Sequence, residues 1–141
     1  MRVFISEYVC GGAWTDGVPG GSLAAEGCDM LLASLVDLLA SPSLHVVTTW
    51  DSRLGEFPLQ HSLCQRLINV AGWAGKNQPL AEQLLPRLTT RTVADPVEEA
   101  AVFAQECQLA DAVFVIAPEF HGILVSVHEL QVPRTSAAAL M

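Results

Sequence analysis

Short apolar stretches alternate along the chain with longer stretches in which apolar residues recur at every third or fourth position. The short stretches are rich in β-branched and aromatic residues, which predict buried strands, and they cover residues 2–9, 44–49, 89–93 and 112–117. The longer stretches predict helices that begin near Ser22 and Pro96. Strands without polar alternation that are separated by helices indicate a parallel sheet covered on both faces.

The boundaries of the two helices carry recognisable signals. Ser22 is expected to cap the first helix, which should end near Pro42 because the residue before a proline avoids the helical region. Asp95 is expected to cap the second helix, with Glu98 and Glu99 favoured near the positive end of its dipole. The side of the second helix expected to pack against the sheet carries Val97, Ala100, Ala101, Ala104 and Cys107.

These elements predict one three-layer α/β domain, a Rossmann-like parallel sheet of about four strands with helices on both faces. A length of 141 residues suits a single domain, and 51% apolar against 16% charged residues is enough for a core. The net charge of −8 disfavours nucleic acid as a partner. No apolar stretch is long enough to span a membrane, and no secretion signal is seen at the N-terminus, so a cytoplasmic location is expected.

Ligands of open parallel sheets bind beyond the carboxyl ends of the strands. That rule selects the segments after the first, second and last strands as one polar rim around a crevice. The candidate substrate-binding residues in these segments are Glu7, Tyr8, Gly11, Gly12, Asp51, Arg53 and Glu119.

Each of these candidates also has a purely structural interpretation. Gly11 and Gly12 either let a ligand approach the main chain or form an ordinary loop. Arg53 either grips a carboxylate or phosphate or pairs with Asp51. Glu119 either caps backbone N–H groups or contacts an amine or metal.

The remaining chemistry-bearing residues predict neither a metal site nor a catalytic residue. Four widely separated cysteines form no C-x-x-C pair, so reduced thiols are expected. The role of Cys10, next to the two glycines, is left open. No serine lies in a nucleophile motif, and the histidines have no metal-ligand spacing.

Three stretches resemble the N-terminal domain of a group of ATP-grasp proteins that includes tyramine-glutamate ligase. They are FISEYVCGGAW (4–14), SLAAEGCDML (22–31) and ADAVFVIAPEFHGIL (110–124), and Asp51-Ser-Arg53 is similar to the Asp-x-Arg of that group. The resemblance implies a pre-ATP-grasp domain over residues 1–130, with an insertion at 55–87. The last residues, 131–141, are expected to be an atypical tail.

The resemblance also implies an activity for the full-length family. Its members are ATP-dependent ligases that join a carboxylate to an amine through an acyl phosphate, with ATP and magnesium held by lobes that lie downstream of this domain. Lys76 is the only lysine in the sequence, so no lysine of this chain is assigned to nucleotide binding. Neither ATP nor magnesium is expected to bind this chain.

Three hypotheses follow. The leading one is a substrate-side N-terminal domain of an ATP-grasp ligase, not catalytic alone and the product of a truncated gene, a frameshift or a genuine short paralogue. The alternative is a free-standing α/β module that binds a small metabolite or a partner. The third is a remnant whose exposed surface, covered by the other lobes in the family, promotes self-association.

Overall fold

The computed structural model describes residues 1–58, 65–66 and 84–118. In this part of the chain four strands form one sheet, and they are β1 (Arg2–Glu7), β2 (His45–Asp51), β3 (Leu88–Val93) and β4 (Ala112–Ile116). Two helices, α1 (Gly21–Leu39) and α4 (Pro96–Leu109), accompany them, with the short 3-10 turns η1 (Ser52–Leu54) and η3 (Leu85–Arg87). The predicted strands and helices are therefore present, with ends shifted by a few residues.

All neighbouring strands are parallel, and their order across the sheet is β3-β2-β1-β4. The central strand β1 pairs with β2 on one side and with β4 on the other, so that Val3 lies opposite both Val46 and Ala112. The chain moves outward from β1 to β3 and then crosses back to β4. This reversal places the switch point of the sheet beside β1, and it confirms the predicted three-layer α/β, Rossmann-like architecture.

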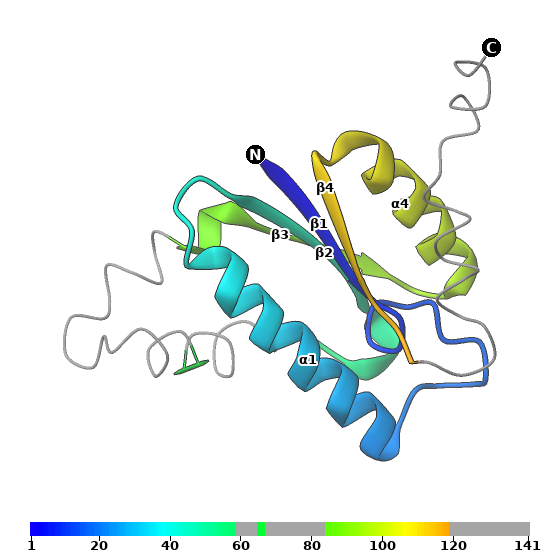
Figure 1. Ribbon diagram of the computed structural model, residues 1–141. Coiled ribbons are helices and arrows are strands. Elements are labelled where there is room, and N and C mark those ends of the chain that lie inside the picture. The colour runs from blue at the N-terminus through cyan, green and yellow to red at the C-terminus, as the bar shows by residue number, and fades with distance from the viewer. Residues whose placement is uncertain (59–64, 67–83, 119–141) are drawn as a thin grey trace, which may run out of the picture.

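One helix covers each face of the sheet (Figure 1). On the α1 side, Leu31, Leu35 and Leu39 pack into a cluster with Ile5 and Val46 of the strands. On the α4 side the cluster contains Phe4, Val47 and Phe103, and the two aromatic rings meet edge to face at 5.5 Å. Successive residues of β1 and β2 are therefore buried on opposite faces, which is why these strands show no polar alternation.

The two helices begin differently. Asp95 caps α4 as predicted, because its Oδ1 accepts hydrogen bonds of 2.9 Å from the backbone N–H groups of Val97 and Glu98. The cap predicted at Ser22 is wrong: Gly20 is the N-cap of α1, with no side-chain cap, and the helix starts at Gly21 with a positive φ of 63°. Glycine adopts that backbone conformation readily, so the helix starts before the serine.

The face of α4 that packs against the sheet also differs from the prediction. Val97 is 81% exposed, whereas the buried residues of α4 are Glu99, Phe103 and Glu106. Glu106 is fully buried because two arginines neutralise it: Arg2 Nη2 lies 2.6 Å and Arg91 Nη1 2.7 Å from its carboxylate oxygens. This triad ties α4 to both β1 and β3.

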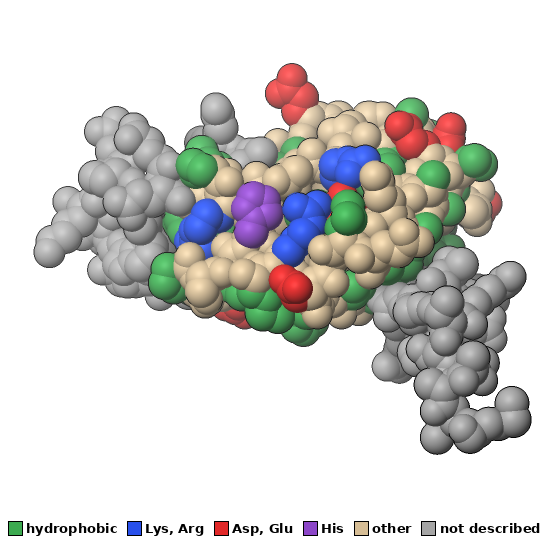
Figure 2. Space-filling model, turned by 90° about the horizontal axis from the view of Figure 1, so that it is seen from above, with side chains coloured by type: hydrophobic (Ala, Val, Ile, Leu, Met, Phe, Trp, Pro, Cys, Tyr) green, Lys and Arg blue, Asp and Glu red, His purple; other side chains and the backbone are tan. Residues whose placement is uncertain are grey.

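The triad lies toward the end of the sheet at which the strands begin. Figure 2 looks onto that end and shows blue basic side chains gathered there with a histidine. Arg87 adds to this group and donates hydrogen bonds of 2.7–3.0 Å to the carbonyl groups of Leu39, Ser41 and Leu44, just beyond the last turn of α1. A cation at this position stabilises the negative end of the helix dipole.

Replacing Glu106 by glutamine is expected to lower the free energy of unfolding by about 3 kcal/mol, because the change leaves Arg2 and Arg91 without their shared anion. Urea denaturation measures this loss. Glu98→Gln is the matched control on the same helix: Glu98 is exposed, and glutamine can still accept the hydrogen bond from the Ala94 N–H. Equal effects of the two substitutions would contradict the role assigned to the triad.

Candidate functional site at the carboxyl edge of the sheet

The segment after β1 folds back over the carboxyl edge of the sheet instead of extending away from it. Gly11 N–H donates to the Glu7 carbonyl at 2.7 Å, and Asp51 N–H donates to the Cys10 carbonyl at 2.8 Å. Tyr8 N–H donates to the Ile116 carbonyl at 2.8 Å, which joins the same turn to β4. The structure thus brings six of the seven predicted residues to one edge, and the seventh, Glu119, lies outside the described residues.

The two glycines allow this turn to lie directly on its neighbours. A Cβ on Gly11 would be 2.3 Å from the Glu7 carbonyl oxygen, and one on Gly12 would be 2.3 Å from Val93 Cγ2. Gly12 also has a φ of 107°, which side-chain-bearing residues rarely adopt. Close packing of the turn therefore accounts for the Gly-Gly pair, which favours the structural interpretation of these residues.

Glu7 points into the protein rather than out of it. Its Oε2 accepts a 2.5 Å hydrogen bond from the Cys10 N–H, and the carboxylate lies against Gly27 of α1, where a Cβ would come within 2.7 Å of Oε2. Only 2% of the residue is exposed. Burial raises the pKa of this carboxyl, although its hydrogen bonds to backbone N–H groups oppose the shift.

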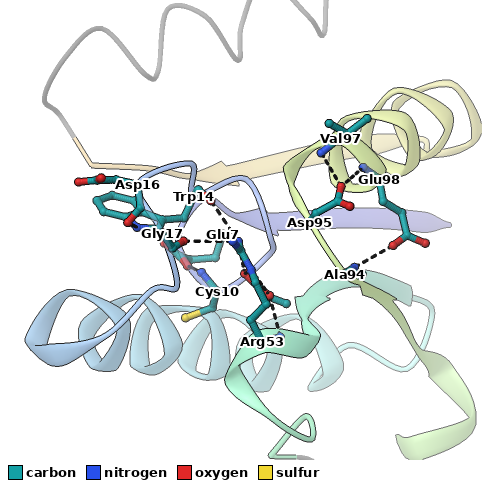
Figure 3. A network of polar contacts seen from close by, with 11 residues as sticks. Glu7, Cys10, Trp14, Asp16, Gly17, Arg53, Ala94, Asp95, Val97 and Glu98 are labelled. Atoms are coloured by element: carbon teal, nitrogen blue, oxygen red, sulfur yellow. Dashed lines mark hydrogen bonds and ion pairs between the residues drawn. The ribbon is translucent and has the colours of Figure 1, made fainter.

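Asp51 and Arg53 are paired, one of the two alternatives left open by the sequence. The fully buried Asp51 carboxylate receives Arg53 Nε at 2.9 Å and Nη2 at 2.7 Å. The same guanidinium donates to the carbonyl groups of Trp14 (3.0 Å) and Gly17 (3.1 Å), as Figure 3 shows. Arg53 therefore fastens the glycine-rich loop to the end of β2, and most of its donors are occupied.

Tyr8 and Arg53 are the described candidates whose side chains remain partly open to solvent, and Tyr8, unlike Arg53, is not held by an ion pair. It is half-buried, and its ring meets that of Trp14 edge to face at 6.4 Å. An aromatic ring of this kind offers a flat apolar surface with a hydroxyl group at its tip. Among the predicted residues that the structure describes, Tyr8 is thus the best placed to contact a ligand.

Glu99 belongs to the same edge, although the sequence analysis placed it only in the first turn of a helix. It is 5% exposed, and its Cβ and Cγ lie next to Gly12. Within the described part of the chain no residue donates a hydrogen bond to its carboxylate, and neither carboxylate oxygen is among the fully buried polar atoms that lack a partner. Burial raises the pKa of Glu99 to about 7, whereas the neighbouring Glu98 is exposed and bonded to the Ala94 N–H at 2.7 Å (Figure 3).

A weak signal for Glu99 was present in the sequence. Glu99, Phe103 and Glu106 are spaced by four and three residues, so they share one side of α4. A search for apolar residues selects the opposite side, because two of these three residues are acidic. Within the described ranges no group of three or more His, Cys, Asp or Glu side chains is arranged to hold a metal ion, and no helix is long and apolar enough to cross a membrane.

Residues 76–140 match the family model of the pre ATP-grasp 3 domain. The match supports a pre-ATP-grasp domain. No curated protein and no solved structure matches the chain. The matched range includes β3, α4 and β4, and it extends into the segment 131–140 that the sequence analysis treats as an atypical tail. A pre-ATP-grasp domain suggests a part of an ATP-grasp type ligase.

Arg53→Ala is expected to destabilise the domain by about 3 kcal/mol, because it leaves the fully buried Asp51 without its counter-ion. Chemical denaturation followed by circular dichroism measures the change. Arg66→Ala is a control that removes an exposed pair with Asp29 and should cost less than about 1 kcal/mol. A smaller loss for Arg53→Ala than for Arg66→Ala would show that Arg53 does not hold the loop.

The titration of Glu99 predicts a pH dependence of stability. The folded state holds the Glu99 proton up to a pKa of about 7, above the ordinary pKa near 4.5 expected in the unfolded chain. Stability should therefore fall as the pH rises from about 4.5 to 7, by about 3 kcal/mol from this group, with Glu7 acting in the same direction.

Glu99→Gln removes the Glu99 contribution to this slope. The variant should be more stable than the parent at pH 8 and differ less from it at pH 5, in urea titrations at both values. An unchanged slope between the two proteins, or a Glu99 carboxyl that titrates near pH 4.5 by NMR, would show that this carboxylate is solvated.

Proposed function

We propose that this chain supplies the substrate-side N-terminal domain of an ATP-grasp type carboxylate-amine ligase, and that it does not turn over ATP by itself. The observation that carries the proposal is the pre-ATP-grasp match, which includes the two edge strands of the sheet, β3 and β4, and the helix α4. The carboxyl edge described above is then the surface that faces the substrate, as expected for the switch point of an open parallel sheet.

The charges at this edge support binding of a substrate rather than of a nucleotide. Phosphate binding needs cations, yet Arg53 at this edge is engaged with Asp51 and two carbonyl groups. Arg2 and Arg91 lie toward the other end of the sheet and are engaged with Glu106. The unpartnered carboxylate of Glu99 instead suits a group that donates hydrogen bonds, above all an amine. We therefore propose that Glu99 and Tyr8 contact the amine-bearing substrate and that ATP and magnesium are held by other lobes.

A free-standing binding module remains the second candidate, because an unpartnered buried carboxylate is a binding feature whether or not other lobes are present. In this version the contacts come from Glu99 and Tyr8 rather than from Glu7, whose carboxylate is buried, or Arg53, whose guanidinium is engaged with Asp51 and two carbonyl groups. The two candidates differ in whether a ligand binds this chain alone with useful affinity or only after the catalytic lobes are added.

The proposal predicts that the purified chain hydrolyses no ATP in the presence of magnesium, measured as phosphate release. Turnover that survives purification of the chain to homogeneity would overturn it. Added ATP-grasp lobes should restore ligase activity with an amine substrate. Glu99→Gln should raise the KM for that amine at least about tenfold, because glutamine keeps an acceptor oxygen but loses the negative charge that strengthens a hydrogen bond from an amine. Glu98→Gln is the matched control and should leave the KM unchanged.

Calorimetry with a panel of small amines separates the two candidates. Saturable binding to the isolated chain that is weakened by Glu99→Gln but not by Glu98→Gln supports the free-standing module. Absence of binding to the isolated chain, together with activity once the lobes are added, supports the ligase domain.

A further inference from the structure

Two cysteines lie near each other where the turn that follows β1 packs on α1. Cys10 Sγ donates a 3.2 Å hydrogen bond to the Ala24 carbonyl of α1. In an α-helix that carbonyl also accepts from the N–H group four residues later, which is that of Cys28. Cys28 packs against the same buried cluster that contains Cys10, and both residues are free thiols.

The two thiols differ in access to solvent. Cys10 is fully buried, whereas Cys28 is partly exposed and lines an open groove of about 410 Å³. The groove is apolar in part, through Leu32 and Pro58, and Arg66 and Asp29 provide charge at its wall. A small molecule that carries a carboxylate and a sulfur atom can therefore reach Cys28 but not Cys10.

The surroundings of the pair favour a thiolate on Cys28. The neighbouring Cys10 side chain lowers the pKa of Cys28 to about 7, with Arg66 contributing in the same direction, although burial, Asp29 and Glu7 oppose the shift. The pKa of Cys10 is raised by the Cys28 side chain, by burial and by the nearby Glu7 carboxylate. At neutral pH the proton thus stays on the buried sulfur, and the accessible sulfur is the nucleophile.

We propose that Cys10 and Cys28 are a redox-active thiol pair, in which Cys28 reacts with a low-molecular-weight disulfide from the groove and Cys10 then displaces the adduct. The Cys28 thiolate attacks one sulfur of the disulfide, a mixed disulfide forms and one thiolate leaves. Cys10 then passes its proton to the neighbouring Glu7 carboxylate and attacks Cys28 Sγ, which releases the second thiolate. The protein loses two electrons, the small disulfide gains them, and one bond links the turn after β1 to α1.

A disulfide between Cys10 and Cys28 would affect the structure at the carboxyl edge of the sheet. The Cys10 N–H group donates a hydrogen bond to the Glu7 carboxylate, and the Cys10 carbonyl accepts one from the Asp51 N–H group. A disulfide bond at Cys10 Sγ therefore restrains the residue that contacts both Glu7 and Asp51. The inference concerns the oxidation state of the chain and holds whether or not the proposed ligase function is correct.

The test uses glutathione disulfide at pH 7 and mass spectrometry without reduction. Cleavage after glutamate places Cys10 in the peptide 8–26 and Cys28 in the peptide 27–56, so their link joins two separable peptides. In the parent protein a glutathione adduct on peptide 27–56 should appear first and then be replaced by the linked pair. Reduction with a dithiol should restore both peptides.

Variants assign the two roles. Cys10→Ser should stop at the adduct on Cys28, and Cys28→Ser should leave Cys10 unmodified. Cys107 is the matched control, a partly buried thiol whose pKa is raised to about 11, and the Cys28 adduct should form at least about tenfold faster than one at Cys107. An adduct that persists on Cys28 of the parent protein, or reaction no faster than at Cys107, overturns the proposal. Because the time course of the parent protein tests it alone, a Cys10→Ser variant that fails to fold does not affect the outcome.

Discussion

The central position of β1 is the constraint on which the rest of this domain depends. β1 is paired on both edges, by β2 and β4, and it is covered on both faces, by α1 and α4. Its side chains therefore have no route to solvent except at its two ends. The polar groups of the domain gather at those ends, with Arg2 at the start of the strand and Glu7 at its finish.

This burial forces carboxylates into an interior that has few cations to pair with them. Four acidic residues are buried in the described part of the chain, whereas the whole sequence has only seven lysines and arginines. Asp51 and Glu106 are each paired with arginine, and Glu7 is bonded to a backbone N–H group instead. Arginines that make several contacts, such as Arg53, therefore stabilise the fold and have few donors left for a ligand.

The sequence predicts most of the backbone and part of the site. Continuous apolar runs locate the four strands, and the Asp95-Pro96 pair locates the start of α4, because both signals are local. The pairing of Asp51 with Arg53 is also a local signal, since the residues are two apart. The burial of Glu106 is not, because one of its partners, Arg2, lies 104 residues away in the sequence. The contact of Cys10 with α1 was hidden for the same reason.

Glu99 differs from the other buried carboxylates in having no structural explanation within the described residues. Substitution of Glu106 by glutamine or of Arg53 by alanine removes an interaction that stabilises the fold. Ionisation of Glu99 instead destabilises the fold, because burial disfavours the charged carboxylate and no described residue donates a hydrogen bond to it. Groups that cost stability in this way are concentrated at functional sites, where a ligand supplies the missing partner. The position of Glu99 next to Gly12, at the edge where β1 ends, makes a hydrogen-bond donor on a substrate the natural candidate for that partner.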